Sequence, residues 1–434
     1  FGSSITAILI KTPGTPAAAA TVLDGYPLAQ KGKGVKAMKM ALYSSVFGDT
    51  FSDVMLIFAA GFLASIALNF GPPEYTLLTG FSLLCVSSLT GNSVWKGLFS
   101  VFLGMIIGMI GLDPITATPR LTFEYLELEE GIGLIPMLIG TLAVSEALRQ
   151  MEQPVKKLAS STLVFSKQKI DNVVTFLEFK STLPTIIKSS GLGTLIGAMP
   201  GLGSTIAAFL AYGEAKRSSK KPENFGKGSL EGIAASESAN NAVSGSNMIP
   251  LLAFGIPGDI AAALIMGAFL IQGITLGPVV FQDNPVEIYA IFAALIVANL
   301  FNLFLGHGLI KMCKHVVTVP KRLLFPAVLV IASAGAYALR GSLFDIQLVF
   351  CFGVLGYVMM KCDIPTVPML IGFILIPIFE ENLRVTLLLG SSHDLNVAFI
   401  FTRPAFVILF LIMTFTSLFI LKRRKLRKLE NINN

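Results

Sequence analysis

Charged residues are scarce in this chain of 434 residues. Asp, Glu, Lys and Arg make up 14% of the sequence and hydrophobic residues 53%, with a mean hydropathy of +0.74. Soluble domains carry about 25% charged residues, so this composition excludes an ordinary soluble protein. Apolar runs of roughly 17–25 residues, long enough to cross a bilayer, recur from end to end and leave no separate soluble domain.

Cysteine and histidine are also rare. The four cysteines have no Cys-x-x-Cys spacing, and His307, His315 and His393 lie far apart in the sequence. We therefore expect no disulfide framework, no zinc site and no cofactor. No Ser-His-Asp or Cys-His grouping suggests a catalytic nucleophile. The net charge of +7 is spread over short segments without an aromatic and basic face, so we expect the lipid bilayer rather than nucleic acid as a partner.

The apolar runs predict an all-α integral membrane protein, a polytopic bundle of about 10–12 transmembrane segments with discontinuous helices. Continuous runs cover residues 40–69, 75–93, 96–112, 131–148, 285–310, 323–340, 342–361, 364–379 and 397–421. Three other apolar regions, 5–30, 184–215 and 247–277, are interrupted at "KTPGTP", "MPGLGS" and "GIPGD".

The charges between the runs predict which side of the membrane each connection faces. Basic segments lie at 31–39, 149–180, 216–227, 311–322 and in the tail 421–428, and the positive-inside rule places them in the cytoplasm. The acidic or neutral segments 124–130, 283–287 and 380–394 are then outside. We interpret "EYLELEE" as a solvated loop and the basic tail as an anchor to anionic lipid.

The two halves of the chain resemble each other weakly at an offset of about 244–250 residues. Residues 3–20 align with 247–264, so that Pro13-Gly14 meets Pro257-Gly258, and "GLDPIT" aligns with "KCDIPT". The predicted orientations of the halves are opposite, which indicates inverted repeats, a feature of secondary transporters. We expect a first repeat at 1–148, a cytoplasmic linker at 149–183, a second repeat at 184–421 and a basic tail at 422–434.

The repeat also predicts a segment before residue 1. The "MPGLGST" break precedes "GIPGD" by 57 residues, and its first-half counterpart would lie a similar distance before Pro13. We therefore expect an N-terminally truncated chain that lacks one interrupted hairpin.

The Pro-Gly breaks are the candidate binding sites. Non-helical backbone inside a membrane is tolerated where it is packed in protein or lines a wet cavity. A restarting helix offers N–H donors and a positive dipole end to a carboxylate, and an ending helix offers carbonyls to a cation. The candidate residues for substrate or ion binding are Thr12, Pro13, Gly14, Thr15, Pro200, Gly201, Gly203, Ser204, Thr205, Asn240, Asn247, Gly255, Pro257, Gly258 and Asp259.

Two of these assignments, and the role of the neighbouring Lys11, have two interpretations. Asp259 is either a ligand of Na⁺ or the N-cap of the restarting helix. In "ESANNAVSGSN", Asn240, Ser244 and Asn247 share a helix face that either lines a cavity or packs against another helix. Lys11 either contacts an anionic substrate or extends its amine toward the membrane surface.

Other functions fit the sequence less well. "GLGTLIGAMPGLGST" looks like a phosphate loop but has no GxxxxGK[ST] and no preceding strand. An integral-membrane enzyme acting on a lipid-linked substrate would need catalytic carboxylates or histidines at one membrane face, and the acidic residues are scattered. An anion channel is the other alternative, and its flux would not depend on an ion gradient.

Several stretches resemble the large membrane subunit of tripartite tricarboxylate transporters. They include "GSSITAILIKTPGTPAAAATVLDGYPLAQKGKG", "GLDPITATPRLTF", "IGAMPGLGSTIAAFLAYGEAKR" and "ESANNAVSGSNMIPLLAFGIPGD", and the resemblance covers residue 2 to about 278 with looser similarity to about 420. It implies a multi-pass permease of the bacterial inner membrane that imports citrate or related carboxylates by symport with Na⁺ or H⁺. It also implies two partners, a small four-span membrane subunit and a periplasmic solute-binding protein.

Overall fold

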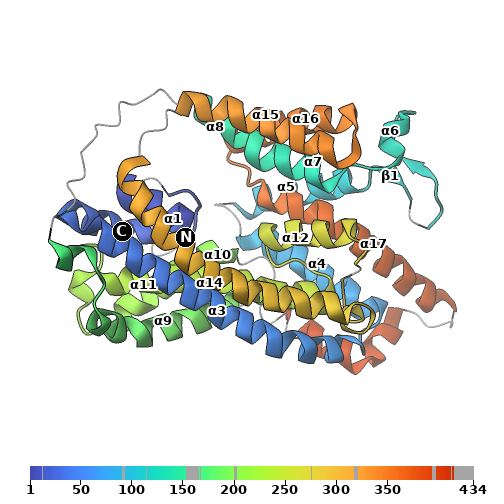
Figure 1. Ribbon diagram of the computed structural model, residues 1–434. Helices are drawn as coiled ribbons and strands as arrows, with labels where there is room; N and C mark the ends of the chain where they lie inside the picture. The colour runs from blue at the N-terminus through green and yellow to red at the C-terminus, as the bar shows by residue number, and fades with distance from the viewer. Residues whose placement is uncertain are drawn as a thin grey trace, which may run out of the picture. The chain divides into compact units, whose positions relative to one another are not determined.

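The computed structural model describes residues 1–414 except 12, 90–92, 114, 153–165, 167, 200–202, 275, 317–320, 393–396 and 412. Helices make up nearly all of the described chain (Figure 1). The strands within it form one antiparallel pair, β1 (Gly111–Leu112) with β2 (Pro119–Arg120), in which Gly111 lies opposite Arg120. The all-α class expected from the sequence is confirmed.

The helices fall into two compact units. Unit 1 comprises Phe1–Ala64 and Ala147–Ile331, and unit 2 comprises Ser65–Glu146 and Ala332–Asn434. Each unit therefore draws helices from both halves of the sequence, and neither unit coincides with one of the expected repeats.

The elements of unit 1 are mostly long helices. They are α1 (Gly2–Ile10), α2 (Ala18–Leu28), the π-helix η1 (Ala29–Lys33), α3 (Gly34–Ala67), the 3₁₀-helix η3 (Lys169–Asn172), α9 (Phe176–Gly197), α10 (Gly203–Ser218), the 3₁₀-helix η4 (Pro222–Asn224), α11 (Leu230–Phe254), α12 (Ile260–Ile271), α13 (Val280–Asp283) and α14 (Pro285–Val316). The last residues of α3 pass into unit 2.

Unit 2 contains the remaining elements. They are α4 (Pro72–Leu89), α5 (Val94–Gly108), β1, β2, α6 (Leu126–Glu129), α7 (Leu134–Leu138), the π-helix η2 (Ile139–Val144), α16 (Leu343–Lys361), α17 (Val367–Ser392) and the 3₁₀-helix η5 (Val397–Thr402). The divisions between the units fall inside α15 (Lys321–Arg340) and near the start of α8 (Ser145–Glu152).

The helices follow the predicted apolar runs with two differences. The basic segment 31–39 is helical, because α2 continues through η1 into α3 with a kink at Gly32, whose φ of 79° suits glycine. The segment expected as an outer connection from Glu380 instead continues α17 to Ser392.

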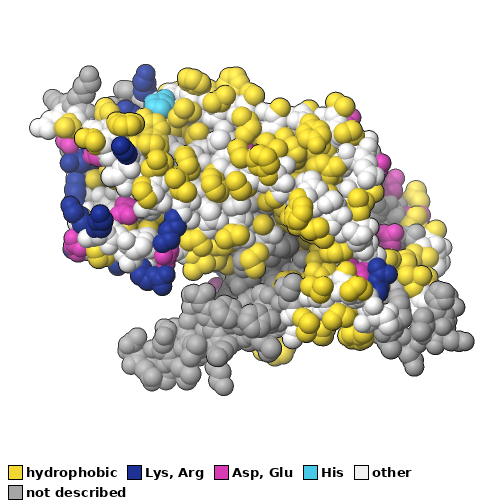
Figure 2. All heavy atoms as spheres, turned by 90° about the horizontal axis from the view of Figure 1, so that it is seen from below, with side chains coloured by type: hydrophobic (Ala, Val, Ile, Leu, Met, Phe, Trp, Pro, Cys, Tyr) yellow, Lys and Arg dark blue, Asp and Glu magenta, His cyan; other side chains and the backbone are white. Residues whose placement is uncertain are grey.

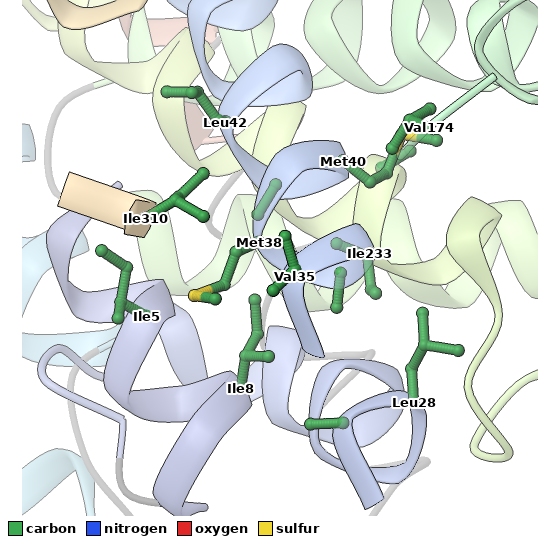
Figure 3. Close-up of a cluster of buried hydrophobic side chains, with 14 of the residues drawn as sticks. Ile5, Ile8, Leu28, Val35, Met38, Met40, Leu42, Val174, Ile233 and Ile310 are labelled. Carbon is green, nitrogen blue, oxygen red and sulfur yellow. The ribbon is translucent and has the colours of Figure 1, made fainter. Parts of the chain in front are cut away.

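Apolar side chains from several helices form the core of unit 1. Ile5 and Ile8 of α1, Val35 and Met38 of α3, and Ile233 of α11 lie in one buried cluster (Figure 3). Helices in a membrane associate mainly through close packing of this kind. The cluster fixes α1, which precedes the first break, against α3 and α11.

Many large hydrophobic side chains are exposed among the described residues, including Phe58, Trp95 and Phe304. Figure 2 shows hydrophobic side chains over much of the visible face, with most of the visible Lys and Arg toward its left side. Within the described residues, three helical stretches are long and apolar enough to cross a membrane: Ala18–Ala67, Pro285–Cys313 and Leu343–Lys361. The total of about 10–12 segments stays a prediction.

Close helix contacts at glycine hold unit 2 together. Helix α5 packs on α17, while α16 packs on α7 and η2. A Cβ added to Gly372 of α17 would lie 2.5 Å from the carbonyl oxygen of Val101, and one added to Gly140 of η2 would lie 2.4 Å from that of Val349. Each glycine therefore lets its helix lie directly against the backbone of a neighbouring helix in unit 2.

Candidate functional site

All three interrupted apolar regions are broken helices in unit 1. Helix α1 ends before Lys11, whose φ of 56° is left-handed, and α2 starts seven residues later at Ala18. Helix α9 ends at Gly197 and α10 begins at Gly203, which has a φ of 65°. Helix α11 ends in Gly255 with a φ of 69°, before α12. The expected discontinuous helices are confirmed.

The helices that restart after the first two breaks pack together. Ala17 and Ala20, at the start of α2, form a buried cluster with Ala208 in the first half of α10. Neither helix has an acidic residue in its first turn. The hydroxyl of Thr15 accepts a hydrogen bond from the Ala18 N–H at 3.4 Å and donates one to the Ser3 hydroxyl at 3.2 Å. Two positive helix ends therefore converge, with hydroxyl groups beside them.

The second and third breaks meet around Gly258. A Cβ added there would lie 2.7 Å from the side-chain oxygen of Asn247 and 3.3 Å from the carbonyl oxygen of Gly197, the last residue of α9. A larger residue at 258 would displace either group. Glycine thus allows the end of α9, the middle of the break after α11 and the Asn247 amide to lie side by side.

Asn247 is the polar side chain at this meeting point. It is 2% exposed, and neither atom of its amide makes a hydrogen bond of good geometry among the described residues, although the Asp259 carboxylate lies nearby. A buried amide without partners costs about 1–3 kcal/mol. The arrangement is suited to a ligand that supplies the missing hydrogen bonds.

Of the two roles left open for Asp259, the structure shows the N-cap. Its side-chain oxygen accepts a hydrogen bond from the Ala262 N–H at 3.0 Å, and its carbonyl accepts one from Ala263 at 3.0 Å. The carboxylate places a negative charge at the positive end of α12. An anionic ligand would be repelled there, so α2 and α10 offer the more favourable ends.

The other predicted residues differ in exposure. Thr12, Pro200 and Gly201 lie outside the described residues. Pro13, Gly14 and Thr15 are exposed, Gly203, Ser204, Thr205 and Asn240 are half-buried, and Gly255 and Pro257 are buried. The Lys11 amine lies over the Tyr26 ring, 5.8 Å from its centre.

Two faces of helix α11 make different kinds of contact near Asn240 and Asn247. Gly193 and Gly197 of α9 approach Ala239 and Val243 so closely that an added Cβ would lie 2.4 Å from the Ala239 carbonyl oxygen in one case and 3.0 Å from the Val243 Cα in the other. That face is a helix contact made by small residues. On the other face, the Ser244 hydroxyl donates to Asp49 of α3 at 2.9 Å.

The sequence interpretation missed Glu237, at the start of the same polar run. Its carboxylate is fully buried and accepts hydrogen bonds from Ser4 at 2.7 Å, from Ser45 at 3.0 Å and from Thr21. These hydroxyls come from α1, α3 and α2. The available signal was an acidic residue among small and apolar ones with no basic residue beside it.

A second buried carboxylate, Asp24 of α2, holds the loop before α11. One oxygen accepts from the N–H groups of Gly226, Gly228 and Ser229 at 2.8–2.9 Å, and the other accepts from the Tyr212 hydroxyl at 2.9 Å. Ser229 is the N-cap of α11, so the carboxylate lies at the positive end of that helix.

Three segments predicted to face the cytoplasm contact one another in unit 1. Lys33 pairs with Asp171 at 3.2 Å and Lys36 with Glu178 at 2.7 Å, which joins segment 31–39 to 149–180. The Lys31 amine donates to the Lys227 carbonyl at 2.6 Å. The predicted orientation requires these segments to lie on one side.

In unit 2, charged side chains in connections predicted to face the outside form ion pairs with one another. Arg120 binds Glu380 at 2.7 Å, and Arg384 binds Asp113 at 2.9 Å. In the loop after α5, the N–H groups of Thr116 and Ile115 and the Arg384 guanidinium hold the pKa of Asp113 well below its ordinary value of 3.8.

Broken helices gathered in one unit of an all-helical membrane protein are typical of secondary transporters. Residues 1–371 match the family model described as "Tripartite tricarboxylate transporter TctA family". The chain belongs to this family, as its sequence motifs predicted, and is a multi-pass membrane component of a tripartite transport system.

Two relatives from Agrobacterium vitis support the match. A protein described as "Uncharacterized 52.8 kDa protein in TAR-I ttuC' 3'region" is 37% identical over 392 residues, which is 90% of this chain and 77% of the relative. Another, "Uncharacterized protein in TAR-II ttuC' 3'region", is 41% identical over 200 residues, which is 46% of this chain and 83% of the relative. No solved structure matches.

Proposed function

We propose that the chain is the permease subunit of a bacterial inner-membrane system that imports di- or tricarboxylates in symport with Na⁺ or H⁺. A periplasmic solute-binding protein delivers the substrate, and a small four-span subunit completes the membrane complex. The family supports the tripartite organisation. The substrate class is argued from the site.

The convergence of the N-terminal ends of α2 and α10 carries the proposal. Both ends lack acidic residues, and the start of α2 at Ala17 and Ala20 packs on Ala208 in the first half of α10. Helix N-termini bind carboxylates through their free N–H groups and positive dipoles. Two ends side by side suit a substrate with more than one carboxylate, and Ser204 and Thr205 add hydroxyl donors at the start of α10.

Alternating access is supported by the arrangement of the breaks. Transporters with inverted repeats place substrate and ion at broken helices between the repeats, which then move relative to a fixed site. Here the first break lies in the expected first repeat at 1–148, and the Gly197 and Gly258 breaks lie in the expected second repeat at 184–421. An enzyme acting on a lipid-linked substrate, or a channel, would not need broken helices from both halves.

The experiment is uptake of a labelled carboxylate into proteoliposomes that contain this chain and its two partners. A Ser204→Ala/Thr205→Ala variant should raise KM about tenfold or more, because a hydrogen bond to a charged group contributes roughly 1.5–3 kcal/mol. Ser218→Ala is the matched control, since its exposed hydroxyl binds the Glu214 carbonyl at the opposite end of α10. An unchanged KM in the double variant would place the substrate elsewhere.

A further inference from the structure

We propose that Glu237, with the hydroxyls of Ser4, Thr21 and Ser45, forms a binding site for Na⁺. Binding of Na⁺ here is independent of substrate, while its role in driving uptake rests on the proposed function. The site is separate from the convergence of α2 and α10, and Glu237 was not among the residues predicted from the sequence.

The geometry gathers oxygen atoms around one carboxylate. Ser4 and Thr21 face one Glu237 oxygen, and Ser45 faces the other at 3.0 Å. Ser236 extends the cluster, because its hydroxyl lies 3.2 Å from that of Thr21. Four helices, α1, α2, α3 and α11, therefore contribute oxygens, the ligand atoms that hard cations such as Na⁺ prefer.

Glu237 forms no ion pair in the described part of the chain. The side chain is 0% exposed and takes part in none of the ion pairs found there. A buried charge costs several kcal/mol unless it is paired. Such groups inside a membrane protein commonly mark ion pathways. A bound monovalent cation would neutralise the carboxylate.

Comparison with Asp24 shows why Glu237 suits a cation. Asp24 is equally buried, but three of its four donors are backbone N–H groups, which have no lone pair to offer a metal. Among the described residues, the side chains that donate to Glu237 are all hydroxyls. A hydroxyl can turn its proton away and present an oxygen lone pair to a cation. Asp24 is therefore a structural anion, whereas the partners of Glu237 can change role.

The position of the site links cation binding to the broken helices. Ser4 lies on α1 and Thr21 on α2, on either side of the first break, while Glu237 lies on α11 ahead of the third. A cation held by all three would fix α1 and α2 against α11. Release of the cation would remove that constraint on the start of α2, where the substrate is proposed to bind.

The test measures thermal unfolding of the purified full chain in detergent, without substrate, as NaCl replaces choline chloride. Na⁺ should raise the Tm in a saturable manner, because a ligand that binds the native state stabilises it. Glu237→Gln retains an acceptor for the hydroxyls and removes the charge, so the concentration of Na⁺ giving half the effect should rise at least tenfold. Thr21→Val should weaken the effect less.

Asp24→Asn is the matched control, because it removes an equally buried carboxylate from the same unit. It should lower the Tm without changing the response to Na⁺. A wild-type Tm that does not respond to Na⁺, or a Glu237→Gln variant that responds as the wild type does, would overturn the proposal. A response to pH that Glu237→Gln abolishes, with none to Na⁺, would also overturn it and indicate a proton site. Each of these results leaves carboxylate uptake to be judged separately.

Discussion

At the scale of single residues, the buried carboxylates of unit 1 are distinguished by their donors. Asp24 is held by backbone N–H groups at a helix end, Asp53 accepts from the Asn299 amide at 2.7 Å, and Glu237 is surrounded by hydroxyls. Fixed donors favour a permanent anion, while hydroxyls also allow a cation. A buried carboxylate thus serves structure in one place and, we propose, ion binding in another.

Asp24→Asn should lower the free energy of unfolding by about 2–3 kcal/mol, because an amide cannot satisfy all four donors as a carboxylate does. Tyr212→Phe removes only one of the four hydrogen bonds and should cost about 1 kcal/mol. Denaturant unfolding in mixed micelles measures both. Equal losses in the two variants would contradict the view that the three N–H groups dominate.

Asp113 predicts a pH dependence. Because its native pKa lies below its ordinary value of 3.8, the folded state binds fewer protons than the unfolded state near that pH. The stabilisation is complete above about pH 4 and is lost as the pH falls further. Asp113→Asn should be less stable than the wild type near pH 6, and the difference should narrow toward about pH 3. Thermal unfolding across this range checks it, with exposed Glu127→Gln as the control; a constant difference would contradict the prediction.

Residues that act within a short segment were predictable, and those with distant partners were not. Asp259 could be recognised as a possible N-cap because the cap depends on the next few residues. The cluster around Glu237 joins residues 192–233 positions away in the chain, and Asp24 binds N–H groups more than 200 positions away. Sequence spacing carries no information about such contacts without the packing of the helices.

At the scale of elements, glycines decide where helices approach. The breaks could be located from the sequence because Pro and Gly within an apolar run interrupt a helix whatever its neighbours. The segments that pack against those breaks could not be predicted from the sequence. The need for glycine at position 258 is explained only by the Asn247 oxygen and the Gly197 carbonyl that lie beside it. The same applies to Gly140 and Gly372, which look like ordinary helical glycines in the sequence.

Gly140→Ala and Gly372→Ala should each lower stability by about 1–3 kcal/mol, because both place a methyl group against a backbone carbonyl that cannot move alone. Gly335→Ala in α15 is the control, since an added Cβ there meets nothing within 4 Å, and it should be neutral or slightly stabilising. Thermal unfolding in detergent compares the three. A loss in only one of the first two variants would show that the contacts are not equivalent.

At the scale of the whole molecule, the sequence predicted the class and the family but not the compact units. Composition and apolar runs are sufficient to identify a multi-pass helical protein, and the motifs identify the family. The units instead combine α1–α3 with α9–α14, and α4–α7 with α16 and α17. Such exchange depends on contacts between distant helices. It is compatible with inverted repeats, whose orientation in the membrane stays a prediction.

The most direct test of the central claim is concentrative uptake. Proteoliposomes containing the full chain and its two partners are given a labelled di- or tricarboxylate under an imposed inward Na⁺ or H⁺ gradient. We predict accumulation above the external concentration, which collapses when an ionophore dissipates the gradient. Absence of uptake across a broad panel of carboxylates, or flux that stops at equal concentrations and ignores the gradient, would contradict a secondary carboxylate transporter.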